Sequence, residues 1–153
     1  MIGLLQRVSQ ARVEVDGETV GRIASGLLVL LAVEPDDTEA EAEALADRLL
    51  RYRVFPDDAG RMNLSVTDTG GSVLMVPQFT LAADTRRGLR PSFTSAAPPA
   101  LGQALFERTV AAARQRLGDQ RVATGRFGAH MLVSLTNDGP VTLWMQVGPA
   151  VTG

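Results

Sequence analysis

The amino-acid sequence predicts an α+β fold: a single compact domain with a curled, mostly antiparallel β-sheet, barrel-like in outline, and two main helices. Short apolar or alternating segments separated by turn residues predict the strands, and two longer segments with apolar residues at helical spacing predict the helices. The chain has 153 residues, which suits one domain with a core, and it contains no internal repeat or linker. We expect this domain to span residues 1–147, followed by a short tail over residues 148–153.

Three strands are expected in the first part of the chain. Residues 2–15 alternate between polar and apolar side chains, and Asp16-Gly17 then provides a common β-hairpin signal. The second strand of this hairpin is expected over residues 18–23. Residues 26–33 are apolar throughout, which indicates a strand buried on both faces.

The first helix is expected to begin after Asp36. Asp37 or Thr38 can cap it, because either side chain can accept a hydrogen bond from the first turn. The helix should end near Tyr52, since the Val54-Phe55-Pro56 segment beyond it is extended. One face of this helix is apolar and comprises Ala42, Leu45, Ala46 and Leu49.

The second half of the chain combines further strands with one long helix. Residues 72–81 form a strand that Pro77 interrupts, because proline cannot donate to a strand ladder and so marks an edge, a bulge or a strand end. A loop over residues 82–94 follows. The second helix opens at Ala97-Pro98-Pro99 and closes at Gly118. The last strands are expected over residues 122–128, 131–135 and 141–147.

Residues 136–141 lie between the last two expected strands and are predicted to form the turn that joins them. Within this turn, Gly139 can adopt backbone angles that other residues avoid, and Pro140 permits a cis peptide bond. Two interpretations are open at this point. The segment is either an ordinary trans turn, or a cis Gly139–Pro140 bond that holds two successive carbonyl groups in one orientation.

The composition excludes several kinds of site. The chain has no Cys, so disulfides, thiolate chemistry and Cys-based metal sites are excluded. Its single histidine, His130, cannot form a histidine-rich metal site and is expected at the surface or with its hydrogen bonds satisfied. We therefore expect no metal and no cofactor. The sequence also lacks a run of about 18–20 apolar residues and the features of a signal peptide, so we expect a cytoplasmic protein without a membrane partner.

The basic residues indicate one candidate surface. All fifteen are Arg, and the net charge of −2 does not by itself indicate nucleic-acid binding. Three of them, Arg86, Arg87 and Arg90, lie within five residues of one another, with Asp84 as the one acid nearby. This cluster is either a solvated loop or an anion-binding rim, in which guanidinium groups would contact phosphates.

Side chains with evident catalytic chemistry are hard to find in the sequence. Ser9, Ser92 and Thr80 stand outside any nucleophile-elbow motif, and no glycine-rich phosphate loop or aromatic-interleaved basic strand is present. The best candidate is therefore a site of main-chain groups around residues 78–80 and 139–140. Preorganised N–H groups stabilise an oxyanion, which suits the hydrolysis of an ester or an amide.

Five motifs occur in an order and spacing that resemble the D-aminoacyl-tRNA deacylase family over residues 1–146. They are Ser9-Gln10-Ala11-X-Val13, Gln78-Phe79-Thr80-Leu81, Arg90-Pro91-Ser92-Phe93, Thr124-Gly125-X-Phe127-Gly128-Ala129 and Asn137-Asp138-Gly139-Pro140-Val141-Thr142. The resemblance implies the compact deacylase fold and a homodimer. It also implies hydrolysis of the ester that joins a D-amino acid, or glycine mischarged on alanine tRNA, to the 3′-terminal adenosine of tRNA.

The resemblance implies a role for each group of residues. Gly139 and Pro140 of one subunit would enter the active site of the other and leave no room for an L side chain, so selectivity would arise by exclusion. The main-chain N–H groups of Phe79 and Thr80 would bind the oxyanion, and Gln78 would fix the substrate or a water. The residues implied to line the pocket are Ser9, Gln10, Met131 and Asn137. Those implied to contact the acceptor end of tRNA are Arg86, Arg87 and Arg90.

One departure from the family concerns Pro77, where the family usually has Ser. The change removes a hydroxyl and a main-chain N–H at the edge of the site, yet we expect activity because the rest of the motif is intact. We expect water to attack with help from the terminal 2′-hydroxyl of tRNA, while Thr80 acts as a positioning group. Two alternatives stay open: a catalytically impaired tRNA-binding homologue, and an unrelated hydrolase of small esters.

Overall fold

The structure is a computed structural model that describes residues 1–148 of the chain. The predicted tail over residues 148–153 therefore lies outside the described residues, apart from Gly148. In chain order, the elements are β1 (Ile2–Val15), β2 (Glu18–Ile23), β3 (Gly26–Ala32), α1 (Glu39–Arg51), β4 (Phe55–Pro56), β5 (Met62–Leu64), α2 (Val66–Thr69), β6 (Ser72–Pro77), the 3₁₀ helix η1 (Phe79–Ala82), α3 (Pro99–Leu117), the 3₁₀ helix η2 (Asp119–Arg121), β7 (Val122–Thr124) and β8 (Leu132–Gln146).

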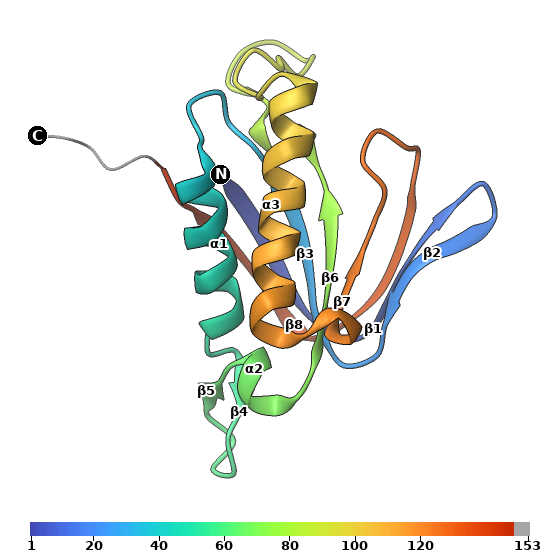
Figure 1. Cartoon of the computed structure of the whole chain (residues 1–153), viewed down its shortest axis with the longest axis vertical. Coiled ribbons are helices and arrows are strands. Elements are labelled where there is room, and N and C mark those ends of the chain that lie inside the picture. Colours follow the sequence, from blue (N-terminus) through green and yellow to red (C-terminus); the bar gives the residue numbers. More distant parts are fainter. Residues whose placement is uncertain (149–153) are drawn as a thin grey trace, which may run out of the picture.

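The main sheet confirms the predicted fold class. Its strand order is β2-β1-β3-β6-β7, and β8 also pairs with β1. The pairs of β1 with β2, β3 and β8 are antiparallel, whereas β3, β6 and β7 run parallel to one another. A parallel pair needs a long crossover, and the segments that contain α1 and α3 provide the two crossovers. Figure 1 shows α1 and α3 side by side on one face of the curled sheet.

The two main helices begin and end close to the predicted positions. Thr38 is the N-cap of α1: its hydroxyl accepts from the Ala40 N–H at 3.2 Å, and the Glu41 carboxylate accepts from the Thr38 N–H at 2.7 Å. Asp37 does not cap, because its carboxylate instead accepts from the amino group of Met1 at 2.8 Å and from the Glu34 N–H at 2.7 Å. The choice that the sequence left open is therefore settled in favour of Thr38.

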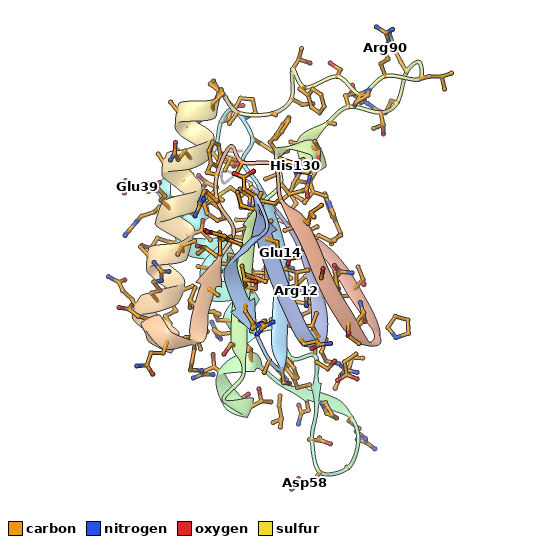
Figure 2. All side chains as sticks on the ribbon, turned by 90° about the vertical axis from the view of Figure 1, so that its right-hand side faces the viewer. Arg12, Glu14, Glu39, Asp58, Arg90 and His130 are labelled. Carbon is orange, nitrogen blue, oxygen red and sulfur yellow. The ribbon has the colours of Figure 1, made fainter. Side chains whose placement is uncertain are left out.

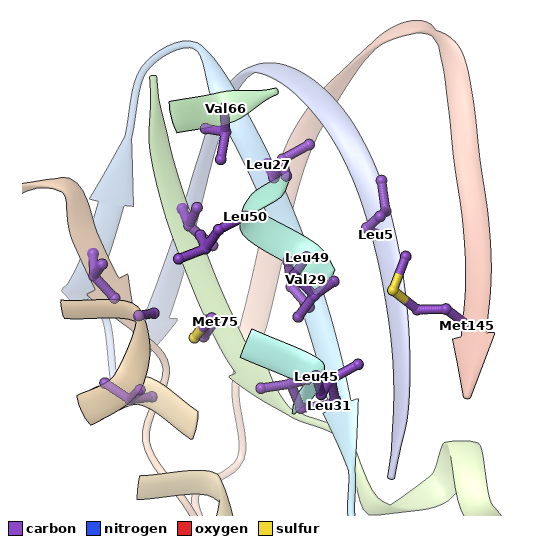
Figure 3. Packing of buried hydrophobic residues seen from close by; sticks show 14 of the residues in the cluster. Leu5, Leu27, Val29, Leu31, Leu45, Leu49, Leu50, Val66, Met75 and Met145 are labelled. Carbon is purple, nitrogen blue, oxygen red and sulfur yellow. The ribbon is translucent and has the colours of Figure 1, made fainter. Parts of the chain in front are cut away.

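Two apolar clusters hold the layers together. The larger cluster joins the helices to the sheet, with Leu45 and Leu49 of α1 packed over Leu27 and Val29 of β3 (Figure 3). The second cluster lies within the curl of the sheet, where the fully buried Val13 is one of its members. Burial of a Leu or Val side chain contributes about 1.5–3 kcal/mol, so these two interiors fix the curl and, with it, the positions of the strand ends.

The end of the chain corrects the predicted strands. The segments expected at 131–135 and 141–147 form one strand, β8, so the prediction of a simple turn between them is wrong. β8 follows β1 on both sides of the segment: Asn137 pairs with Val8, and Thr142 pairs with Gln6. Four residues of β8 thus lie opposite Arg7 alone, as an irregularity within one long strand.

The neighbouring strand is shorter than expected. Strand β7 ends at Thr124 rather than at residue 128. The Gly125 N–H still donates to the Met75 carbonyl of β6 at 2.8 Å, but Pro77 cannot donate the next bond, and Gly128 adopts a positive φ of 76°. Within residues 1–148, no helix is both long and apolar enough to cross a membrane.

Candidate active site

A cavity of about 470 Å³ lies at the carboxyl end of β6. The ends of β3 and β6 form one side, the first turns of α3 form another, and residues 127–131 close it. Crevices beyond the carboxyl ends of parallel strands are common ligand sites in sheets covered by helices. A larger hollow of about 680 Å³ runs along α3, but none of the predicted site residues lines it.

Gln78 and Phe79 line this cavity, and Thr80 follows them directly in the chain. The Gln78 N–H donates to the Leu31 carbonyl at 2.7 Å, which extends the β3–β6 ladder by one residue. The chain then turns into η1, whose first bond is from the Leu81 N–H to the Gln78 carbonyl at 3.1 Å. Among residues 1–148, the main-chain N–H groups of Phe79 and Thr80 have no acceptor. The start of a 3₁₀ helix leaves such donors unpaired, and two adjacent unpaired donors can bind an oxyanion.

The Thr80 hydroxyl lacks a base. It accepts a hydrogen bond from the Gln78 side-chain amide, and no carboxylate or imidazole is bonded to it within the described residues. A hydroxyl nucleophile needs such a base, so this geometry does not activate Thr80 for attack. His130 also lines the cavity and is exposed, as expected from the sequence (Figure 2). Within residues 1–148, no group of three or more acidic or histidine side chains could hold a metal ion.

Pro77 lies at the end of the ladder between β6 and β7. Alternate residues of β6 donate to β3, since Ser72 bonds to Ser25 and Gln78 bonds to Leu31. The nitrogen of Pro77 therefore faces the other neighbour, β7, whose last pair is Met75 with Thr124. The Gly125 N–H still donates to the Met75 carbonyl at 2.8 Å, and the next donor in this ladder would be the nitrogen of Pro77, which carries no hydrogen. The proline therefore ends the ladder between β6 and β7.

The Gly139–Pro140 peptide bond is cis, so the second of the two interpretations holds. Both residues are exposed. A Cβ atom on Gly139 would lie 2.5 Å from the Val141 nitrogen, which leaves no space for any side chain at this position. The main chain of this segment is thus presented to solvent without covering side chains.

Two side chains hold this segment in place. Asn137 accepts from the Val141 N–H at 2.7 Å and donates to the Val141 carbonyl at 3.2 Å. On the other side, Arg7 donates to the Asp138 carbonyl at 2.8 Å and to the Val54 carbonyl at 2.6 Å. Arg7 was not among the residues predicted from sequence, whereas Asn137 was predicted as a pocket residue; in the structure Asn137 braces this segment.

Within one chain, residues 139–140 lie far from residues 78–80. Asn137 pairs with Val8, Val8 with Gly26, and Gly26 with Ser72, so this level of the sheet is the start of β6. Gln78 follows the other end of β6, roughly 20 Å away at about 3.3 Å per residue. The structure therefore places the two candidate elements at opposite ends of the same sheet.

The remaining predicted pocket residues divide between these two ends. Met131 lines the cavity beside Gln78. Ser9 and Gln10 are exposed and line a separate hollow of about 420 Å³ near Thr136, to which Gln10 donates at 3.4 Å. A single chain thus does not bring Ser9 and Gln10 to the cavity.

The Arg cluster lies on a loop at the cavity end of the molecule. Asp84 and Ser92 exchange main-chain hydrogen bonds of 2.8 and 3.0 Å, which close the loop at its base. Arg86 pairs with Asp84 at 2.7 Å, which holds the pKa of the Asp84 carboxyl well below its usual range and raises the pKa of Arg86. Arg87 and Arg90 are exposed, and within residues 1–148 neither has an ionic partner. Figure 2 shows Arg90 at the far tip of this loop, at the same end as His130 and opposite Asp58.

Comparison with known sequences gives consistent matches. A family model described as D-Tyr-tRNA(Tyr) deacylase matches residues 4–146. The D-aminoacyl-tRNA deacylase of Janthinobacterium sp. (strain Marseille) is 65% identical, over 99% of this chain and 100% of that relative. The D-aminoacyl-tRNA deacylase of Thioalkalivibrio sulfidiphilus (strain HL-EbGR7) is 62% identical, over 97% of this chain and 99% of that relative.

Solved structures share the fold. The c-Myc DNA Unwinding Element Binding Protein superposes with a TM-score of 0.93 at 34% identity, over 97% of this chain and 100% of that one. A probable eukaryotic D-amino acid tRNA deacylase superposes with a TM-score of 0.85 at 20% identity, which is a likeness of fold alone. With the family model matching nearly the whole domain and relatives above 60% identity along their full lengths, the chain belongs to the D-Tyr-tRNA(Tyr) deacylase family.

Proposed function

We propose that this protein hydrolyses the ester that joins a D-amino acid to the 3′-terminal adenosine of tRNA. The observation that carries the proposal is the pair of unpaired N–H groups at Phe79 and Thr80, on the rim of a cavity large enough for an amino-acid side chain. Ester hydrolysis passes through an oxyanion, and fixed main-chain donors stabilise it without a side-chain nucleophile. The relatives named above supply the identity of the ester.

In this mechanism, water is the nucleophile. Its oxygen bonds to the ester carbonyl carbon while the carbonyl oxygen becomes the oxyanion held by the N–H groups of Phe79 and Thr80. The bond to the ribose 3′-oxygen then breaks, and that oxygen takes up the proton released by the water. The neighbouring 2′-hydroxyl of the substrate assists the proton transfer, because Thr80 has no base and the side chain of Gln78 is occupied with positioning Thr80.

The proposal includes a homodimer whose site is shared between subunits. The Gly139–Pro140 segment lies roughly 20 Å along the sheet from its own cavity, so only a second copy could bring it to that cavity. Its exposed position and its rigid bracing by Asn137 and Arg7 support this role. Main-chain atoms at the cavity mouth would exclude an L side chain while admitting a D-amino acid or glycine.

Strand β8 offers a surface for such a dimer. It is an edge strand of fifteen residues, and an unpaired edge of this length favours association with another chain. Three of its large apolar side chains are exposed, namely Leu132, Leu135 and Trp144. Exposed apolar groups along one element mark interaction surfaces. As a tRNA-directed enzyme, the dimer would act in the cytoplasm.

The test is hydrolysis of matched substrates by the purified protein. We expect rapid release of D-tyrosine from D-Tyr-tRNA, release of glycine from Gly-tRNA(Ala), and only background release from L-Tyr-tRNA. Binding of D-Tyr-tRNA without turnover would instead support the catalytically impaired homologue that Pro77 raised as an alternative. Turnover of simple esters with indifference to tRNA would support the small-ester hydrolase.

A further inference from the structure

Two aromatic rings form an exposed pair, and one of them, Phe79, lines the cavity. The ring centroids of Phe79 and Phe93 lie 5.1 Å apart with an angle of 58° between the ring planes, a tilted arrangement that aromatic pairs favour. Phe79 is 56% exposed and Phe93 is 42% exposed. Phenylalanine is usually buried, so two adjacent exposed rings at the rim of a site indicate a contact surface.

The backbone holds Phe93 in this place. The loop between Asp84 and Ser92 carries the Arg cluster and is called the Arg loop below. The Asp84–Ser92 hydrogen bonds close it immediately before Phe93. After Phe93, its carbonyl accepts from the Ala96 N–H at 3.0 Å, and the Ala97 N–H donates to the Val33 carbonyl at 3.0 Å. Val33 and Ala97 both line the cavity, so the segment that follows Phe93 is anchored to the cavity wall. The pair is therefore a built feature of the rim rather than a loose loop end.

The charges near the pair are basic. The loop that the Asp84–Ser92 bridge closes carries Arg86, Arg87 and Arg90, and Arg86 offsets the one nearby carboxylate, Asp84. Arg87 and Arg90 are left to attract an anion from solvent. Exposed aromatic rings next to unpaired guanidinium groups are the combination with which proteins bind single-stranded nucleic acid: bases stack on the rings, and phosphates contact the cations.

We propose that the Phe79–Phe93 pair is a stacking platform for an unpaired base at the 3′ end of the tRNA. This inference rests on the proposed function and deepens it. The amino acid occupies the cavity, the ester lies against the Phe79 and Thr80 N–H groups, and a base of the same strand lies on the rings. Because every base has a π-face, the platform accepts any tRNA and contributes affinity without sequence readout.

The test compares Phe93→Leu with Phe93→Tyr on two substrates, D-Tyr-tRNA and D-tyrosyl-adenosine. Phe93 is chosen because the N–H of Phe79 has a separate role. Loss of one base–aromatic stack weakens binding by about 5- to 160-fold, so Phe93→Leu should raise KM for D-Tyr-tRNA by about 5-fold or more with kcat unchanged. Phe93→Tyr retains a ring and should restore the wild-type KM. Leu89→Ala, at a fully exposed position of the same loop, is the matched control and should change neither constant.

The second substrate identifies the base. If Phe93→Leu raises KM equally for D-tyrosyl-adenosine, the stacked base is the terminal adenine; if only D-Tyr-tRNA is affected, it is a base on the 5′ side of that adenosine. The inference is overturned if KM for both substrates is unchanged while the wild type is active, if kcat falls instead, or if Phe93→Tyr is as impaired as Phe93→Leu. A shift of Phe93→Leu to a monomer in light scattering would overturn it as well, because the rings would then be a protein contact. An inactive wild type would contradict the proposed function itself.

Discussion

At the scale of single residues, the site is built from main-chain groups that a few side chains keep in place. Gln78 holds the Thr80 hydroxyl, while Asn137 and Arg7 hold the Asp138–Val141 segment from opposite sides. None of these contacts provides a nucleophile with its base. In the proposed mechanism, selectivity and catalysis depend on where backbone N–H and carbonyl groups are presented, and substitutions test this directly.

Thr80→Ala should keep most of the activity. The substitution retains the Thr80 N–H and removes only a hydroxyl that has no base, so we expect kcat on D-Tyr-tRNA to fall by less than about tenfold, below the effect of losing a general acid or base. Single-turnover hydrolysis would measure this, with circular dichroism as a check on folding. A loss of about 10³-fold in a folded variant would instead indicate a covalent intermediate on Thr80.

Gly139→Ala should weaken discrimination against L substrates. The new Cβ would lie 2.5 Å from the Val141 nitrogen and 2.8 Å from its Cγ2 atom, so the segment has to shift. We expect a lower ratio of D-Tyr-tRNA to L-Tyr-tRNA hydrolysis than in the wild type. Gly148→Ala, where a Cβ meets nothing within 4 Å, is the control. Wild-type rejection of L-Tyr-tRNA by Gly139→Ala would remove this segment from the selectivity mechanism.

At the scale of elements, local signals fix the ends that position the site. The Thr38–Glu41 capping box begins α1, and Pro77 ends β6 at the level where β7 no longer pairs. Both ends fall beside the cavity wall: Leu31 and Val33 precede the α1 cap, and Gln78 follows Pro77. A change in either end is therefore expected to alter stability or the geometry of the rim.

The capping box should make stability depend on pH. Hydrogen bonds from the Thr38 side chain and main chain lower the pKa of Glu41 below 4.5 in the folded protein. The stabilisation is thus fully present above the unfolded-state pKa and is lost as the pH falls through the lower folded value. Glu41→Gln should lower the free energy of unfolding in urea at pH 7, and this difference should shrink at pH 3. Asp36→Asn is the control, because it removes a nearby exposed carboxylate that makes no hydrogen bond in the described residues. Its free energy of unfolding should depend on pH in the same way as that of the wild type. A constant Glu41→Gln difference across both pH values would contradict the assignment.

Many of the helix and strand boundaries could be predicted from the sequence, because the signals that set them are local. The helical spacing of Leu45 and Leu49 predicted α1, and Pro77 predicted the break before residue 78. The second long helix was predicted from the prolines at its start and from Gly118 at its end. Pairing partners are not local. The parallel β3–β6 pair and the continuous β8 depend on which strands the curled core brings together, so the turn at 136–141 was predicted instead of one long strand.

Some residues of the candidate site could likewise be predicted from local signals, and others could not. Gln78 to Thr80 could be predicted because the strand visibly breaks at Pro77. Arg7 could not, because its acceptors at Asp138 and Val54 lie 131 and 47 residues away in the sequence. Ser9 and Gln10 belong to a motif near Val8, and the register places them with the Gly139 end of the sheet rather than with the cavity.

At the scale of the whole molecule, the two candidate elements lie at opposite ends of the sheet. The cavity and the Arg loop lie at one end, and the braced Gly139–Pro140 segment lies at the other. An antiparallel dimer through β8 would bring each end of one subunit toward the opposite end of its partner. In the proposed mechanism the site would be complete only in this dimer, so dissociation should affect selectivity and rate together.

Charges on the exposed face of β8 should separate the dimer. The double variant Leu132→Arg, Trp144→Arg replaces two exposed apolar side chains of β8 by like charges, so we expect a folded monomer in multi-angle light scattering with little activity on D-Tyr-tRNA. Met62→Arg alters an equally exposed apolar residue on β5, outside the main sheet, and should remain a dimer. A monomeric wild type, or a fully active monomeric double variant, would contradict the shared site.

The most direct measurement uses a heterodimer purified with two different tags. One subunit carries Phe79→Pro, which removes an oxyanion donor and inactivates its own cavity, and the other carries Gly139→Ala. The only working cavity then belongs to the Gly139→Ala subunit, while the intact Gly139–Pro140 segment belongs to its partner. If the segment acts across the dimer, the heterodimer should recover the wild-type ratio of D-Tyr-tRNA to L-Tyr-tRNA hydrolysis. If the ratio stays at the low value of the Gly139→Ala homodimer, the segment does not act on the cavity of the other subunit.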